Sequence, residues 1–381
     1  MTKPPRRNTC VTRTILAAAT LFLAACSVNP ATGERNFTAF MSPEDELQIG
    51  RDQHPKIIQQ FGGVYGDPKI TAYVDRVGQN LAQVSELPEL DFTFTVLNDD
   101  IVNAFALPGG FVYISRGLLG LANTEAELAG VLGHEIGHVT GRHSAQRHSQ
   151  SVLAGIGTAG VSILSSVFLG TSAVGDAVGQ GAGVYLQGFS REHEFEADTL
   201  GVRYLSRTGY ETGAMASFLS SLEAFSALEA KVSGLPDPAS RYNIMSTHPR
   251  TGDRVNAAAR AANVKPVANP KTGSREYLAA IDGVIFGDSE DEGFVRGRRF
   301  IHEPANFMFE VPQGFALFNG AQQVAARGPD ESLILFSGGK ISHRGSMESY
   351  LTRVWAKNTS LADVETIDIN GMMMIEWKFC P

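Results

Sequence analysis

The sequence predicts a mainly helical domain with a small β-sheet, followed by a smaller α+β domain. Two observations support the first domain: apolar residues recur at helical spacing through most of 42–262, and the spacing becomes strand-like between residues 92 and 114. A third supports the second domain, since proline and glycine interrupt the chain after residue 262 and strand-like alternation returns beyond them. We therefore expect domains at 42–262 and 263–381.

The composition is that of an ordinary folded protein. The chain of 381 residues is 43% hydrophobic and 19% charged, and its formal net charge is -8. The first 25 residues carry 4 cations and no acid, so the remaining residues carry a net charge of -12, four below that of the whole chain. This acidic balance argues against nucleic acid as a partner.

The first 25 residues have the pattern of a secretory signal peptide. A basic region ending at Arg13 precedes an apolar run that is short for a bilayer span. The run ends in Leu23-Ala24-Ala25-Cys26, which resembles a bacterial lipobox, and this resemblance implies that Cys26 is acylated. Ser27 after the cysteine favours the outer membrane over the inner one. The alternative is an ordinary signal peptide followed by a chance cysteine.

A polar stretch rich in Asn, Pro and Thr, residues 26–41, is expected to be a tether between the lipid and the folded part. The first helix should then begin after Ser42, with Pro43 and three acidic residues in its first turn, and run toward Phe61. A second helix is expected from Pro68 to about Ser85, because its apolar residues have helical spacing.

Strands follow these two helices. Alternation from Phe92 to Leu97 predicts one strand, and two further apolar segments flank the turn residues Pro108-Gly109-Gly110. We expect these segments, 104–107 and 111–114, to form a β-hairpin. A helix should begin after Thr124, where Thr124-Glu125-Ala126-Glu127 is close to a capping box.

The stretch from Ser151 to Phe189 is rich in glycine and carries one charged residue. It is either a mobile segment near the cleft or the membrane surface, or a pair of small core helices, and the sequence favours neither. Helices are expected over 191–206, 211–231 and 254–262, and strands around 307–311 and 332–336.

The motif His134-Glu135-Ile136-Gly137-His138 lies in the helix that follows Thr124. Residues four apart share a helical face, so His134 and His138 can reach one Zn²⁺ at about 2.0 to 2.1 Å. Glu135 is turned toward the cleft, where it can take a proton from zinc-bound water. Apolar residues precede the motif, and burying these side chains without a metal would leave polar groups unpaired.

A third ligand must come from elsewhere in the chain. A metzincin-type histidine would need glycine three residues after His138 and histidine three residues later, but Gly141 is followed by Ser144 at that position. His143 lies one residue too early, so we expect it at a helix end or in support of a ligand.

Glu194 and Asp198 are the best candidates to complete the site. They are four residues apart on one helical face, so one carboxylate can bind zinc while the other accepts a hydrogen bond from a ligating imidazole. We assign the ligand role to Glu194 and the supporting role to Asp198. We expect Glu192, His193 and Glu196 to point elsewhere and to serve as surface residues.

These segments resemble a known family of zinc peptidases, which includes HtpX and the CAAX prenyl proteases, and most closely its periplasmic BepA-type envelope proteases. The resemblance covers roughly residues 40 to 262. It is carried, in chain order, by Asn103-Ala104-Phe105-Ala106-Leu107-Pro108-Gly109-Gly110, by the His134 to His138 motif, by Ser190-Arg191 with Glu194 to Asp198, and by His248-Pro249 with Arg254.

The resemblance implies roles for the first and last of these segments. Asn103, Ala104, Phe105, Ala106 and Leu107 would form an edge strand that binds extended substrates through main-chain hydrogen bonds, with broad specificity. His248 would lie beside the metal, where it could stabilise the oxyanion or occupy the open coordination position, and Arg254 would support the site. A histidine merely packed before a proline is the alternative for His248.

The sequence thus predicts a gluzincin-type endopeptidase with one Zn²⁺ per chain, bound by His134, His138 and Glu194, and with Glu135 as general base and then acid. It would cleave extended or misfolded proteins of the cell envelope, as a periplasmic protein anchored by lipid and possibly acting with the outer-membrane assembly machinery. One alternative is a non-proteolytic chaperone or assembly lipoprotein with a structural zinc, and another is a zinc amidase acting on cell-wall peptides.

The second domain, 263–381, does not resemble the helical-repeat domain of BepA-type members, and its end reads as truncated or altered.

Overall fold

The computed structural model of the chain describes residues 26–159, 188–233, 248, 252–264, 266–321, 323–329, 332–336, 344–357, 361–369 and 372–379. The predicted signal peptide and most of the glycine-rich stretch lie outside these residues. The chain divides into two compact units, one ending at Phe336 and one starting at Ser337. The predicted domain boundary near residue 263 lies within the first unit and remains a proposal.

The residues after Cys26 are folded onto the first unit. Strand β1 (Cys26–Val28) pairs antiparallel with β2 (Arg35–Phe37), and Asn29 between them is buried. Arg142 donates to the Ser27 hydroxyl at 3.1 Å and to the Met41 carbonyl at 2.9 Å. This hairpin differs from the polar tether expected from the sequence, because Ser27 and Asn29 also form hydrogen bonds with Arg142 and Glu196, which lie more than 100 positions away.

Helix α2 (Pro43–Gln60) begins as the sequence predicts. The Ser42 hydroxyl accepts from the backbone N–H of Asp45, whose carboxylate accepts from the Ser42 backbone N–H. This reciprocal capping box satisfies two backbone donors at the helix start. Helix α3 (Pro68–Ala82) is capped in a related way by Asp67 and buries its apolar face.

The first unit contains the predicted hairpin in a three-stranded sheet of order β3-β5-β4. Strand β3 (Thr93–Leu97) pairs parallel with β5 (Phe111–Ser115), which pairs antiparallel with β4 (Ala104–Leu107). Gly109 in the β4-β5 turn has φ +81°, and an added Cβ would lie 2.6 Å from the Cα of Leu47. The turn therefore requires glycine, both because of its positive φ and because a Cβ would collide with Leu47.

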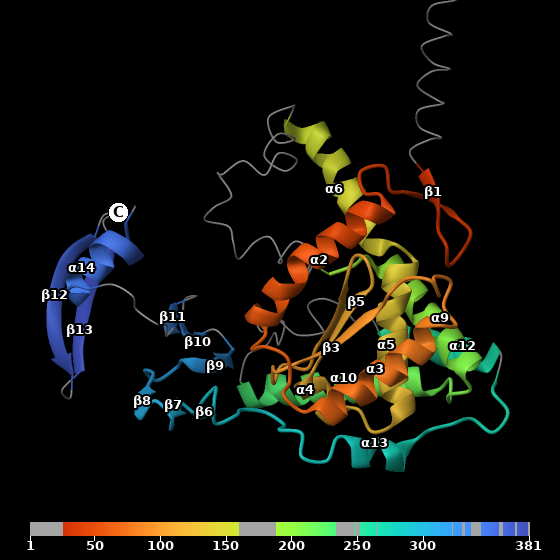
Figure 1. Cartoon of the computed structure of the whole chain (residues 1–381). Coiled ribbons are helices and arrows are strands. Elements are labelled where there is room, and N and C mark those ends of the chain that lie inside the picture. Colours follow the sequence, from red (N-terminus) through yellow and green to blue (C-terminus); the bar gives the residue numbers. More distant parts are fainter. Residues whose placement is uncertain are drawn as a thin grey trace, which may run out of the picture. The chain divides into compact units, whose positions relative to one another are not determined.

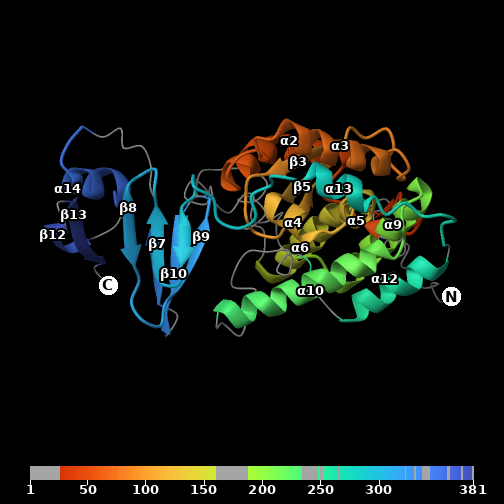
Figure 2. The same cartoon turned by 90° about the horizontal axis from the view of Figure 1, so that it is seen from below.

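The central helix α5 (Glu125–Thr140) is buried at every residue. It packs against strand β4 and against three helices, which are labelled in Figures 1 and 2: α3, α9 (Arg191–Thr208) and α10 (Ala214–Ser233). A Cβ added at Gly133 would lie 3.2 Å from the Cα of Gly201, so glycine on both helices permits their close approach. Short helices surround this core: α4 (Arg116–Leu121), α6 (His143–Ala159), α12 (Gly252–Val264) and α13 (Ser274–Ala280).

The chain beyond α13 is rich in β-structure. Two three-stranded antiparallel sheets complete the first unit: β6 (Phe294–Arg296), β7 (Arg299–His302) and β8 (Phe307–Glu310), then β9 (Ala316–Gly320), β10 (Gln323–Arg327) and β11 (Leu333–Phe336). The second unit contains α14 (Met347–Tyr350), a π-helical turn η3 (Leu351–Trp355) and the hairpin of β12 (Leu361–Ile369) and β13 (Met372–Phe379). In the part of the chain that is described, we find no helix with the length and apolarity to span a bilayer.

Candidate metal centre

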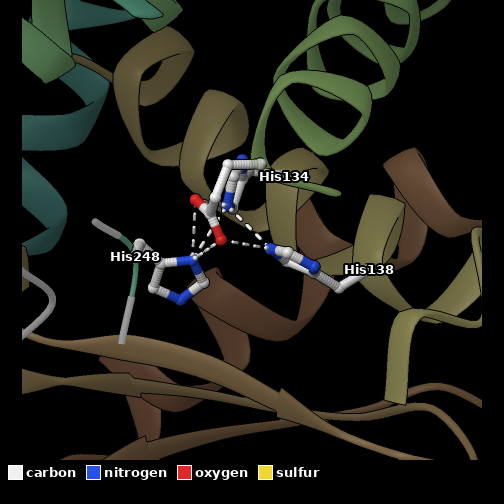
Figure 3. A group of neighbouring side chains, drawn as sticks. His134, His138 and His248 are labelled. Atoms are coloured by element: carbon white, nitrogen blue, oxygen red, sulfur yellow. Dashed lines mark hydrogen bonds and ion pairs between the residues drawn. The ribbon is translucent and has the colours of Figure 1, made fainter. Parts of the chain in front are cut away.

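Two helices, α5 and α9, supply the predicted ligands. His134 and His138 lie one turn apart on α5, and Glu194 lies in the first turn of α9, which begins after the capping residue Ser190. His248 comes from the chain before α12. In Figure 3 the imidazoles of His134, His138 and His248 turn toward one another.

The ligand atoms of these four buried residues lie within 4.8 Å of one another. Nε2 of His134 is 3.0 Å from Nε2 of His138, and these atoms are 3.6 and 3.4 Å from the nearer carboxylate oxygens of Glu194. Atoms bound tetrahedrally to one zinc at about 2.0 to 2.1 Å would be separated by roughly 3.3 Å. The three predicted ligands therefore fit a zinc ion, and His248 Nδ1, 3.2 Å from His134 Nε2, is placed where a fourth ligand would be.

Asp198 and Arg254 lie beside this cluster. Oδ1 of Asp198 lies 2.9 Å from Nδ1 of His134, on the side of the ring opposite the cluster. The guanidinium of Arg254 donates two hydrogen bonds of 2.7 Å to Asp198 and lies 2.7 Å from Glu194. One arginine thus holds both carboxylates of α9 in fixed positions.

Glu135 is fully buried on α5. Within the described part of the chain neither of its carboxylate oxygens has a hydrogen-bond partner, and Oε1 lies 3.5 Å from Nε2 of His248. Burial raises the pKa of Glu135, although the adjacent His248 opposes this shift. A buried, unpartnered carboxylate is costly unless something else binds to it, so this residue is suited to accept a proton from a bound molecule.

The charges of the cluster compensate one another. Burial alone would raise the pKa of Glu194, but the imidazoles of His248 and His138 outweigh it, so this pKa lies well below its usual range. Burial lowers the pKa of His138 well below its ordinary value, which keeps the imidazole neutral. A carboxylate and neutral imidazoles are the forms in which these groups bind zinc.

Some residues around the site have contacts that the sequence did not suggest. Glu196 and His193, expected on the solvated surface, both contact His143: the carboxylate lies 3.4 Å from His143 Nε2, and the two imidazoles stack at 4.3 Å. Phe189 stacks on His138 at 4.0 Å. The signal was the spacing of His143 five residues after His138, but only the side-chain contacts of His143 with His193 and Glu196 give it a meaning.

The predicted substrate strand lies at the edge of its sheet. β4 is the last strand in the order β3-β5-β4, and the side chains from Asn103 to Leu107 are buried. These residues are buried as a whole, backbone included, so a peptide could pair with this strand only after its edge becomes accessible. Cys26 begins strand β1, and nothing in the structure tests its lipidation.

Comparison with known proteins agrees with this site. Residues 68–262 match the model of peptidase family M48. The beta-barrel assembly-enhancing protease of Yersinia pestis is 33% identical over 248 residues, covering 64% of this chain and 49% of that protein. The Escherichia coli K12 protein of the same name is 31% identical over 229 residues, covering 58% and 45%.

A mitochondrial protein also matches the chain. Mitochondrial metalloendopeptidase OMA1 of Schizosaccharomyces pombe is 29% identical over 234 residues, which is 59% of this chain and 63% of that protein. The chain spans about half the length of the bacterial relatives that it matches. The family match covers just over half of the 381 residues and includes every predicted metal ligand. The chain therefore belongs to peptidase family M48, a family of zinc metallopeptidases.

Proposed function

We propose that this protein is a gluzincin-type zinc endopeptidase. The observation that carries the proposal is the buried set of His134, His138 and Glu194 at tetrahedral separations, with the unpartnered carboxylate of Glu135 beside it. Asp198 and Arg254 act as supporting residues, because they hold the ligands without replacing any of them.

Zinc bound at this site would polarise a peptide carbonyl and lower the pKa of a water molecule. Glu135 accepts the proton of that water and then donates it to the leaving amine. Burial raises its pKa, which is the direction that lets a carboxylate hold the proton between the two steps. The burial of the site excludes competing solvent.

His248 is the residue placed to control access to the fourth coordination position. Its Nδ1 lies 3.0 Å from Glu194 and its Nε2 faces Glu135. Bound there, it would keep the site in a resting state; displaced by substrate, it would be available to stabilise the oxyanion. Burial tends to lower the pKa of His248, but Glu194 and Glu135 raise it above its ordinary value.

The edge position of β4 supports extended substrates. A peptide pairing with Asn103 to Leu107 would gain main-chain hydrogen bonds once this edge, which is buried in the structure, became accessible. Such recognition favours unfolded or misfolded segments over particular sequences.

We place this activity in the bacterial cell envelope. The bacterial relatives are named as proteases that enhance β-barrel assembly. With a lipid on Cys26, this protein would act in the periplasm, at the outer membrane more readily than at the inner one, on envelope polypeptides and near the assembly machinery of β-barrel proteins.

The test uses purified, zinc-loaded protein that starts after Cys26, with casein as an unfolded substrate. We expect the wild type to cleave it and Glu135→Gln to lose activity while retaining zinc, because the variant removes the proton acceptor and no ligand. Glu194→Ala should lose both zinc and activity. Equal casein cleavage by wild type and Glu135→Gln would contradict the proposal, and cleavage of peptidoglycan fragments alone would favour an amidase.

A further inference from the structure

The two ligating imidazoles are supported differently on their Nδ1 sides. Nδ1 of His134 faces a carboxylate, that of Asp198, at 2.9 Å. Nδ1 of His138 instead faces another imidazole, with its Nδ1 2.8 Å from Nδ1 of His143. His143 is the first residue of α6 and is completely buried, so this contact lies in the interior.

The proton positions in this contact follow from the chemistry of the ligand. His138 must present the lone pair of Nε2 to the metal, so its proton is on Nδ1. His143 Nδ1 must therefore accept that hydrogen bond, which leaves the proton of neutral His143 on Nε2. That atom has no hydrogen bond among the described residues, and the nearest carboxylate oxygen, Oε1 of Glu196 at 3.4 Å, is within electrostatic contact of it.

The chain of contacts continues into the N-terminal hairpin. Nδ2 of Asn29 donates to the same Oε1 of Glu196 at 2.8 Å. Asn29 is only 1% exposed, and its side-chain oxygen accepts from the backbone N–H of Ala31 at 2.8 Å. The asparagine is therefore fixed in the β1-β2 turn, and it holds the carboxylate that faces His143.

Two stacked rings limit rotation of these imidazoles. Phe189 stacks on His138 with centroids 4.0 Å apart and planes 18° apart, and His193 stacks on His143 at 4.3 Å and 13°. His193 also lies 3.3 Å from the side-chain oxygen of Gln146. The rings are thus held in plane, and the hydrogen bonds then select their tautomers.

We propose that Asn29, Glu196 and His143 form a relay that orients His138 for the metal, so that the N-terminal hairpin is a working part of the metal centre. The inference rests on the zinc site of the proposed function. The relay gives His138 the support that Asp198 gives His134 directly, and it makes His143 and Glu196 positioning residues.

The test measures zinc affinity by competition with a chelator and the absorption spectrum of the Co²⁺-substituted protein. His143→Leu should weaken zinc binding by about 10- to 100-fold, which is the usual effect of losing an outer hydrogen-bond partner. His143→Asn should restore most of the affinity, because its side-chain oxygen can accept from His138. Glu196→Gln should show a smaller loss and a shifted Co²⁺ spectrum, whereas Glu192→Gln, an exposed charge change on the same helix, should show neither.

Folding is checked by circular dichroism for every variant. Wild-type zinc affinity in folded His143→Leu would overturn the relay, as would equal losses in His143→Leu and His143→Asn. Glu196 is half-buried, so its substitution tests the outer step with little risk to the fold, and an unchanged affinity and spectrum there would remove Glu196 and Asn29 from the proposal. Because zinc affinity needs no substrate, a protein that shows these losses but cleaves nothing would contradict the proposed activity and support the relay.

Discussion

At the scale of single residues, the metal centre depends on how buried charges are paired. Arg254, the carboxylates of Glu194 and Asp198, and the imidazoles of His134 and His248 are all nearly inaccessible to solvent. Removing one partner from such a set leaves another buried and uncompensated. The same side chains that would orient zinc ligands therefore also contribute to the stability of the apoprotein.

Asp198→Asn is expected to weaken zinc binding by about 10- to 100-fold without unfolding the protein. The amide keeps the shape of the carboxylate, but it loses the charge that fixes the proton of His134 on Nδ1 and that pairs with Arg254. Zinc affinity by chelator competition is the measurement. Asp253→Asn is the matched control, since that carboxylate pairs with Arg191 on the exposed surface; equal effects in the two variants would contradict a specific role for Asp198.

At the scale of elements, the close packing of α5 on α9 decides whether the two ligand sets meet. A Cβ added at Gly137 would lie 3.1 Å from the carbonyl oxygen of Ala197 and 3.2 Å from its Cα, which is backbone that cannot rotate away. Gly137→Ala should therefore separate the helices slightly, at a cost of roughly 1 to 3 kcal/mol in the free energy of unfolding.

Chemical denaturation of Gly137→Ala should give a lower free energy of unfolding than that of the wild type. Its zinc affinity should be lower as well. Gly213→Ala provides the control, because a Cβ there would meet only the side chain of Glu211 at 3.7 Å. A Gly137→Ala protein that is as stable as the wild type and binds zinc equally well would show that the helix separation is not critical.

Glu125, the first residue of α5, should make the stability of the fold decrease at acidic pH. Burial would raise the pKa of Glu125, but hydrogen bonds from Lys271, Tyr210 and Tyr73 outweigh it and lower this pKa below 4.5. Because the pKa is lower in the folded state, the stabilisation is complete above the unfolded value and is lost as the pH falls through the folded one.

We therefore expect the melting temperature to fall as the pH decreases below 4.5, and Glu125→Gln to reduce this dependence while lowering stability at pH 7. Thermal melts of the metal-free protein between pH 3 and pH 7, a range that spans roughly the ordinary carboxyl titration, provide the test. Parallel pH curves for wild type and variant would rule out Glu125 as the responsible group.

At the scale of the whole molecule, one buried arginine joins distant parts of the first unit. Arg116 is completely buried, donates to the carbonyls of Ile285 and Gly287, and forms a 2.6 Å ion pair with Glu292. Burial raises the pKa of Glu292, although Arg116 opposes this shift. The chain after α13 is thus attached to the start of α4 through this side chain.

Arg116→Ala is expected to destabilise the fold by roughly 3 to 5 kcal/mol, because four acceptors, on Asn98, Ile285, Gly287 and Glu292, lose their buried donor. Limited proteolysis should then cleave near residues 285–292 before the rest of the first unit. Arg296→Ala serves as the control, since its guanidinium is exposed and lies 3.9 Å from Asp288. Equal proteolytic resistance in both variants would argue against this attachment.

Local signals in the sequence were sufficient for most elements of the first unit. Ser42 with Pro43 located the start of α2, and Thr124 that of α5, because capping depends on residues within one turn. The turn at Gly109 located the hairpin, since positive φ favours glycine. The sequence did not predict the β1-β2 hairpin, whose partners are distant and whose residues are mostly polar.

The sequence by itself determined the chemistry of this protein: a helical pair of histidines with an adjacent glutamate, and two carboxylates four residues apart on a second helix. The reason is that helical periodicity places such residues on one face whatever surrounds them. Only the tertiary structure decided that the two helices touch through glycines, that His248 closes the cluster, and that His143, Glu196 and Asn29 connect His138 to the N-terminal hairpin. Those contacts join residues separated by up to 167 positions, and such separations follow from packing rather than from any local pattern.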